Sequence, residues 1–432
     1  MIIMKSAAAG LLAGLLAAGM LAPVSASASQ ELVGSAGAAD SSSFSSASGE
    51  ARQEAAAREE TIPDGQMKSR LTGEYVSEEE GMRRPVAFMI DNVKDADPPS
   101  GISSASVYYE CEVESDLSRI CAVFGDGAWD QEGKIGPLRS CRDYFISLVA
   151  GLDPIYEHYG QAAYALPYLE SDDVDNISGL MSYSYDAFYR DGPHAAPHNA
   201  YTSGEGINTL IGELGYRTAY RDGSLPELTF RAVGDDVTPD GRDASYVALG
   251  YPFNQPVFTY HAEDGCYFRS QYGHEHTDLE TGSQLYVKNI ILEYQNAANY
   301  QNSSYKHYET TGSGKGKYIT NGKAVDITWE RDSFYSPVVY RTADGNVLRL
   351  NPGKTWVAVI RKDQLNQCRI GADESSASAV EDAGTIAEQK QEMDAWVSEY
   401  KAGEEAYLSK MAQQRSDNVA KHGGTKVEVG LS

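Results

Sequence analysis

The segment ASVYYECEVESDLSRICAVFGDG, residues 105–127, contains two apolar runs rich in strand-forming residues, separated by a short polar stretch. The two runs, 105–115 and 119–127, are close enough in the chain to be the arms of one hairpin. A similar run at 84–92, RPVAFMIDN, precedes them and ends in Asp91 and Asn92 before a proline-containing turn. The sequence therefore predicts a group of strands at the start of the folded chain.

Helical patterns follow these strands. Apolar residues recur at threes and fours in 142–152, which predicts a helix. Residues 154–160 predict another strand, and 161–171 predict a helix that is interrupted near Pro167. Because strands and helices mix without a strict strand–helix–strand alternation, we expect an N-terminal α+β domain over residues 81–245.

A second domain is expected over residues 250–365, built mostly from antiparallel strands. Residues 283–294 are rich in β-branched residues, and Asn-Gly at 321–322 lies between two apolar-patterned arms. Asn-Gly is a strong signal for a tight hairpin, and Asp-Gly at 344–345 repeats it. The fold class we expect is therefore α+β, with a mixed first domain and a β-rich second one.

The two ends of the chain differ from these domains. Residues 1–28 combine a basic start at Lys5 with an apolar stretch and small residues, which is typical of a cleaved export signal. Residues 29–80, rich in Ser, Ala, Gly and Glu, are expected to be a disordered spacer. Residues 376–421 show apolar residues at threes and fours, which predicts an appended amphipathic helix.

The mature chain is expected to lack a membrane-spanning segment. A retained anchor is the alternative, because the apolar stretch of the signal nearly reaches spanning length. No Cys follows that stretch, so no lipid could be attached there. We expect an extracellular or cell-envelope protein.

Charge and cysteine content exclude several classes of protein. A net charge of −26 would repel phosphate backbones and anionic surfaces, so nucleic-acid binding is excluded. The five cysteines are far apart, form no CxxC pair and are odd in number, unlike a disulfide scaffold. Cys141 opens a helical pattern and could be a nucleophile, but a buried small apolar residue is favoured.

Two motifs that suggest a cofactor or a metal are better explained as ordinary structure. TGSGKGK at 311–317 lacks the phosphate-loop pattern, because Glu309 stands where the first Gly should be and Gly316 where Ser or Thr should be. In 272–278, His274 and His276 share one face of any strand with Asp278, but zinc would need a further ligand. We expect no cofactor and no metal ion.

The stretch RDGPHAAPHNAYTS, residues 190–203, places His194 and His198 four residues apart. Pro193 and Pro197 prevent a helix and predict a stiff loop that holds His198 and its neighbour Asn199 in place. An imidazole and an amide held beside a site can recognise a ligand or carry a proton. A purely structural role for each is the alternative.

Charged residues lie within the apolar elements. Glu110, Glu112 and Glu114 alternate, so we expect all three to project from one face of a strand. Arg139 and Arg142 are three residues apart. Guanidinium groups opposite carboxylates could form an internal ion-pair network or a clamp for an anionic ligand group.

Eight segments in consistent order across residues 81–363 resemble the YerB-like lipoproteins, a bacterial family of unassigned function. They are RPVAFMIDN, YYECEVESDLSRICAVF, KIGPLRSCRDYF, IYEHYG, FYRDGPHAAPHNAYTS, GHEHTDLETG, TGSGKGKYITNGKAVDITW and LNPGKTWVAVI. The resemblance implies an N-terminal α+β domain, a separate C-terminal domain and an envelope location. The missing lipid-accepting Cys and the helical tail depart from the family pattern.

The leading hypothesis is a non-catalytic envelope protein that binds a wall component or a protein partner through a polar cleft of the first domain. The residues expected to line it are Asp91, Glu110, Arg119, Arg139, Arg142, His198 and Asn199. The alternative is a cell-wall hydrolase in which Glu110 or Glu157 acts with His198 as an acid–base pair. Because no nucleophile motif is present, the sequence assigns no catalytic residue.

Overall fold

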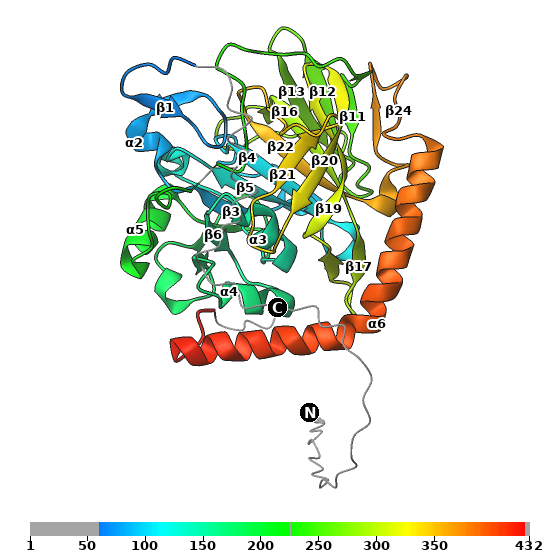
Figure 1. Cartoon of the computed structure of the whole chain (residues 1–432). Helices are drawn as coiled ribbons and strands as arrows, with labels where there is room; N and C mark the ends of the chain where they lie inside the picture. Colours follow the sequence, from blue (N-terminus) through cyan, green and yellow to red (C-terminus); the bar gives the residue numbers. More distant parts are fainter. Residues whose placement is uncertain (1–59, 225, 428–432) are drawn as a thin grey trace, which may run out of the picture. The chain divides into compact units, whose positions relative to one another are not determined.

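The computed structural model of the chain describes residues 60–224 and 226–427. Strands dominate this part, in one large and one smaller sheet, with helices packed on the outside (Figure 1). The expected α+β class is confirmed. The helices are α2 (Glu78–Gly81), α3 (Asp143–Ala150), α4 (Leu166–Leu169), α5 (Gly204–Leu214) and α6 (Ala383–His422).

The large sheet has eleven strands within the described residues. In spatial order they are β10 (Arg242–Asp243), β20 (Lys323–Arg331), β19 (Gly312–Thr320), β16 (Asn289–Gln295), β22 (Thr355–Arg361), β4 (Val107–Glu112), β5 (Ser118–Phe124), β3 (Val86–Asp91), β6 (Ile155–His158) and β7 (Asn176–Ser178), with β21 (Val339–Thr342) beside β20. Two of the predicted hairpins are present as the antiparallel pairs β4–β5 and β19–β20, whereas the turn at 344–345 is flanked by a single bridge between Arg341 and Val347.

Strand β22 joins the two regions of the sequence. It runs parallel to β16 on one side and parallel to β4 on the other, so it departs from the antiparallel pattern expected of the second region. Because β4 belongs to the first region and β22 to the second, one continuous sheet passes through both expected domains. The division near residue 250 therefore does not separate two sheets.

The smaller sheet covers one face of the large one. Its strands are β14 (His274–Glu275), β13 (Cys266–Gln271), β12 (Val257–His261), β11 (Tyr246–Ala248), β23 (Arg369–Gly371) and β24 (Ser378–Ala379), with β15 (Tyr286–Val287) beside β13. Trp356 of β22 is fully buried between the sheets, stacked on Tyr108 at 4.7 Å and edge-on to Phe258 at 5.3 Å. Aromatic burial of this kind is a large source of stability.

Helices α3, α4 and the second half of α6 cover the opposite face of the large sheet, whereas α5 packs in the same core as the smaller sheet. Tyr144, Phe145 and Leu148 of α3 are buried there, together with Leu166 of α4 and Met411 of α6. Helix α6, orange to red in Figure 1, contacts η6 (Lys362–Gln364), β17 (Ala297–Asn299) and then α4. β17 pairs with β18 (Lys306–Tyr308) in a separate ribbon. A side-chain cap at Asp382 begins α6, and Gly423 at positive φ ends it.

The prediction of a disordered spacer is wrong for residues 60–80. This segment forms the ribbon of β1 (Gln66–Lys68) and β2 (Tyr75–Ser77), followed by α2. Leu71 in its turn is buried in the core, and Ser77 and Glu80 form a capping box at the start of α2. Strands of three residues are too short for an alternating hydrophobic pattern to be recognised. Residues 1–59, with the expected export signal, lie outside the described residues.

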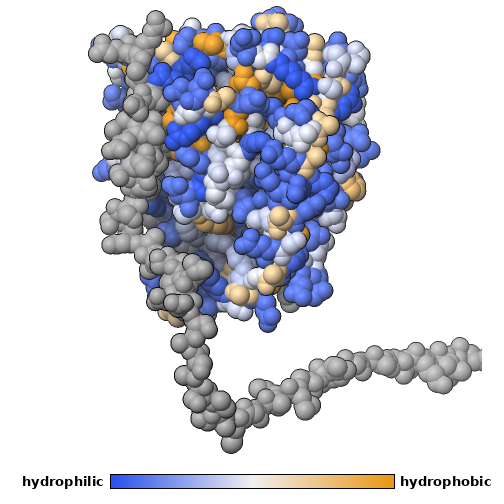
Figure 2. All heavy atoms as spheres, turned by 45° about the vertical axis from the view of Figure 1, so that its right-hand side comes forward, coloured by the Kyte–Doolittle hydropathy of each residue, from blue (hydrophilic) through white to orange (hydrophobic). Residues whose placement is uncertain are grey.

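The surface is mostly polar. On the face shown in Figure 2, hydrophilic residues predominate and hydrophobic ones form small groups, mainly in the upper part of the view. In residues 60–427, no described helix combines the length and the apolar character needed to cross a membrane.

Candidate functional site

Three of the residues singled out in the sequence meet at the surface. Asp91 is the last residue of β3, Arg139 precedes α3, and His198 lies in the loop between β8 (Tyr189–Arg190) and β9 (Ala200–Tyr201). The Oδ2 atom of Asp91 lies 2.7 Å from Nδ1 of His198 and 3.1 Å from Nε of Arg139. The Asp91 side chain is 1% exposed, against 26% for Arg139 and 19% for His198.

Backbone contacts hold the loop that carries His198. β9 lies beside the segment before α3, where the N–H of Leu138 donates to the carbonyl of Ala200 at 2.7 Å. Within the loop, the N–H of His198 donates to the carbonyl of Ala195, and His194 contacts the carbonyl of Pro98 at 3.2 Å. His198 is therefore fixed at both its backbone and its ring.

Asn199 has a different contact from its neighbour. Its side-chain oxygen accepts a hydrogen bond from Nη1 of Arg190 at 2.9 Å. Arg190 and Asn199 lie at the two ends of the loop, so this bond joins the ends. Asn199 therefore supports the loop that presents His198.

Arg119 and Arg142 form a second cluster around Glu114. Arg119 lies directly opposite Asp91 in the β3–β5 register, and its Nη2 lies 3.1 Å from Oε1 of Glu114. Arg142 donates from Nε and Nη2 to both oxygens of Glu114, at 2.9 and 2.5 Å. Burial alone would raise the pKa of Glu114, but the two guanidinium groups outweigh it and lower the pKa to about 2.

Replacing Glu114 with Gln should lower the free energy of unfolding by about 2 kcal/mol at neutral pH, after allowance for its partial exposure. Because the folded pKa is depressed, the contribution of Glu114 is complete above pH 4.5 and is lost as the pH falls toward 2. Urea unfolding at neutral pH and at about pH 3 checks this. The two proteins should differ less at the lower pH, and a constant difference would contradict the assignment.

Glu110 does not lie with the other residues expected in the cleft. Successive strand residues face opposite sides, and Glu110 faces the smaller sheet whereas Asp91 faces the helices. Its carboxylate accepts from Nη2 of Arg269 at 2.9 and 3.0 Å, and both side chains are 0% exposed. Further bonds to Glu110 come from Asn92, Ser118 and Asn254.

The expectation that Glu110, Glu112 and Glu114 share one strand face is wrong for Glu114. β4 ends at Glu112, which contacts Gln364 and Arg361. Glu114 begins the turn η2 (Glu114–Asp116), in which Ser115 and Asp116 have positive φ. The change of backbone direction in this turn carries the Glu114 carboxylate to Arg142.

The acid–base pair predicted for a hydrolase is not formed as expected. Glu157 is fully buried in β6, and neither of its carboxylate oxygens has a hydrogen-bond partner among the described residues. Burial raises its pKa well above the ordinary value. Glu110 is enclosed by Arg269, so the carboxylate beside His198 is that of Asp91.

The geometry around His276 argues against a metal site formed with His274 and Asp278. Nδ1 of His276 lies 2.5 Å from Nη1 of Arg269, which can only donate, so the ring proton is on Nε2. A neutral histidine protonated on Nε2 has no lone pair to offer there. The oxygens of Asp278 accept from the backbone N–H groups of Gly101 and Ser103. His276 and Asp278 are therefore engaged in contacts within the fold.

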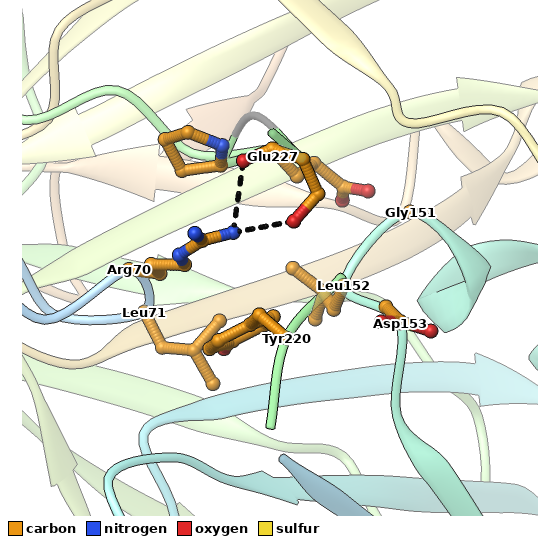
Figure 3. Close-up of a pocket in the computed structure, with 9 residues that line it drawn as sticks. Arg70, Leu71, Gly151, Leu152, Asp153, Tyr220 and Glu227 are labelled. Carbon is orange, nitrogen blue, oxygen red and sulfur yellow. Dashed lines mark hydrogen bonds between the residues drawn. The ribbon is translucent and has the colours of Figure 1, made fainter. Parts of the chain in front are cut away.

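Cys141 is not an activated nucleophile. It is fully buried, and burial raises its pKa to about 12. A pocket of about 20 Å³ lies elsewhere, between Arg70, Gly151 and Tyr220 (Figure 3). The guanidinium of Arg70 stacks on Tyr220 at 4.1 Å, and its Nη1 donates to the carbonyl and the hydroxyl of Ser224. A space of this size holds about one water molecule and is too small for a ligand.

Sequence reasoning did not single out Arg269 and Gln271, which complete the network around Glu110. Gln271 donates to both Asn92 and Asp97 at 3.0 Å. In the strand CYFRSQ, alternating polar residues usually indicate the solvent-facing side. Here they face the interior, and the local pattern contains no signal for that reversal.

Comparisons with known proteins match both halves of the chain. Residues 71–217 match the "Protein of unknown function (DUF3048) N-terminal domain", and 247–357 match the corresponding C-terminal domain. The chain is 28% identical over 309 residues to "Putative lipoprotein YerB" of Bacillus subtilis (strain 168), covering 70% of this chain and 89% of the relative. The crystal structure of YerB from Bacillus subtilis matches with a TM-score of 0.61 at 27% identity, over 72% of this chain and 99% of that one.

Proposed function

The chain belongs to the YerB-like family defined by the two DUF3048 domains, and from this premise we propose a non-catalytic binding module of the cell envelope. Arg139 and His198, here called the surface pair, would bind an acidic group of a wall component or of a protein partner. The observation that carries the proposal is the buried carboxylate of Asp91 holding both side chains while each stays partly exposed.

The geometry suits recognition of a carboxylate or a phosphate. A guanidinium whose Nε faces Asp91 still has four N–H donors on its two terminal nitrogens. Because Nδ1 of His198 donates to the Asp91 carboxylate, Nε2 is the atom available to a ligand, and it donates to an acidic group in the imidazolium form of the ring. An ion pair with Arg139 and a hydrogen bond with His198 hold both side chains at one buried carboxylate, so they lose little conformational entropy when a ligand binds.

The nearby arginines are less suited to ligand contact. Arg119 and Arg142 are 5% and 4% exposed, and both are paired with Glu114. Arg119 also donates to the carbonyl of Ser140 at 2.7 Å, and Arg142 to that of Cys141 at 2.9 Å. They support the segment that carries Arg139.

An envelope location is part of this proposal. Residues 1–28 have the pattern of an export signal, and the similar protein of Bacillus subtilis bears the name of a lipoprotein. A protein outside the membrane would meet wall peptides, wall polymers and envelope proteins. Acidic groups on any of these could reach the surface pair.

Binding to isolated cell-wall sacculi tests the proposal. Replacing Arg139 with Gln, or His198 with Gln, should weaken binding about tenfold or more, since a charge-assisted hydrogen bond contributes about 1.5–3 kcal/mol. The quantity measured is the fraction of protein that co-sediments with sacculi at increasing wall concentration. A pull-down of envelope proteins with the same variants tests a protein partner.

Arg221→Gln is the matched control, because Arg221 is 51% exposed and only weakly paired with Asp153 at 3.8 Å. This variant should bind like the unchanged protein. If sacculi and envelope proteins both bind equally well to the Arg139 and His198 variants, the surface pair is not the binding site.

A hydrolase remains a second candidate because of one contact. Hydrogen bonding of a buried aspartate to Nδ1 of a histidine orients the ring as a general base, with Nε2 facing the substrate. This candidate predicts release of soluble fragments from sacculi, abolished by His198→Gln. Binding without release supports the binding module instead.

A further inference from the structure

A polar groove separates the first half of α6 from the β19–β20 hairpin and encloses about 420 Å³. Ser313 lies opposite Glu330 in the hairpin register, and Lys315 lies opposite Thr328. Directly opposed residues share a face of the sheet, so these four side chains line the floor together. The groove shares no lining residue with the surface pair. Its α6 residues come later in the chain than residue 357, where the match to the C-terminal family domain ends.

The glycine-rich first half of β19 shapes this floor. A Cβ atom on Gly314 would lie 2.6 Å from the indole nitrogen of Trp329, so a larger residue cannot occupy the position without displacing the ring. Trp329 is 3% exposed, and its N–H donates to the carbonyl of Tyr294. The TGSGKGK motif thus permits close packing under the groove.

The wall of the groove carries a buried acceptor. Gln389 of α6 is 1% exposed, and its Nε2 donates to Oε2 of Glu392 at 2.9 Å. Lys362, which is 6% exposed, donates to the same oxygen at 2.9 Å. Among the described residues, Oε1 of Gln389 has no hydrogen-bond partner. A buried acceptor without a donor is unfavourable, so a ligand that supplies a donor would relieve that state.

The charges that line the groove compensate one another. Lys315 pairs with Glu388 at 3.0 Å, and Lys362 pairs with Glu392 at 2.9 Å. Glu330 pairs with Arg341 at 2.8 Å. A charged ligand would have to compete with one of these pairs, whereas a neutral ligand can bind beside them. The groups that remain are the hydroxyls of Ser313 and Thr328 and the amide oxygen of Gln389.

We propose that this groove binds a short, uncharged saccharide that donates a hydroxyl or acetamido hydrogen to Oε1 of Gln389. Hydroxyls on the floor match the mixed donor and acceptor character of sugar hydroxyls. The volume lies within the range of about 300–1,000 Å³ that is usual for small-molecule sites. The saccharide contacts Gln389 on one side and the hairpin on the other.

Isothermal titration of the purified protein with N,N′-diacetylchitobiose and, separately, with cellobiose tests the proposal. At least one should bind with a dissociation constant of about 1 mM or tighter. Thr328→Phe fills the floor with an aromatic ring and should weaken this binding at least about tenfold. Gln389→Leu removes the acceptor at similar volume and should also weaken it.

Thr259→Phe is the matched control, since Thr259 is an exposed strand residue of the smaller sheet. It should bind like the unchanged protein. Thermal unfolding of each variant separates loss of binding from loss of folding. The proposal is overturned if neither sugar binds to the unchanged protein at about 10 mM. It is equally overturned if binding persists unchanged in folded Thr328→Phe and Gln389→Leu proteins.

Discussion

Replacing Glu110 with Ala will lower the free energy of unfolding by about 3–5 kcal/mol, because the change leaves the guanidinium of Arg269 buried without its counter-ion. Arg269 is 0% exposed and stacks on Trp356 at 4.6 Å between the two sheets. Urea unfolding followed by tryptophan fluorescence gives the difference.

A double replacement separates the burial of a charge from the loss of packing. Glu110→Leu combined with Arg269→Met exchanges the ion pair for apolar side chains, which is often neutral or stabilising. The double variant should therefore be more stable than either single variant. Glu388→Ala, at an exposed position of α6, is the control and should change stability by less than about 0.5 kcal/mol. Additive effects of the two single changes would refute a coupled pair.

Glu157 will make the protein lose stability as the pH rises. Its pKa in the folded state lies well above 4.5 because burial disfavours the charged form. The unfolded chain therefore releases its proton first. The contribution of Glu157 to the free energy of unfolding is complete below pH 4.5. Between pH 4.5 and the folded pKa, this contribution falls by about 1.4 kcal/mol for each pH unit.

Glu157→Met should remove this contribution while keeping an unbranched side chain of similar size. The quantity to compare is the difference in unfolding free energy between the two proteins from about pH 5 to pH 8, since other groups titrate equally in both. This difference should grow in favour of the Met variant with rising pH. Glu157→Gln, which cannot ionise, should show the same trend. A pH-independent difference would show that the carboxyl is not buried in its neutral form.

Local signals in the sequence predicted the elements that depend on neighbouring residues. Two apolar runs separated by a polar stretch predicted β4–β5, and Asn-Gly at 321–322 predicted β19–β20. The neighbour of β4 on its other side is β22, and this parallel pair joins segments far apart in the chain. No local pattern specifies which distant strand supplies such a partner, so the continuous sheet could not be predicted.

The candidate site was predicted only in part, because it too depends on which strands pair and in which register. Polar residues at the ends of elements indicated Asp91, Arg139 and His198, and these three do meet. The face on which a strand residue lies depends on the pairing register, and a shift by one residue reverses it. Glu110 is thereby separated from Asp91, although the sequence shows both as acids within apolar strands.

The position of β22 between β4 and β16 also governs when the nascent chain can fold. β4 lacks its parallel neighbour until residue 361 has been synthesised, so the first region cannot complete its sheet during early translation. A chain with the export signal expected at residues 1–28 would thus stay open enough to be threaded across a membrane. The fold would close only after nearly all of its strands had reached the far side.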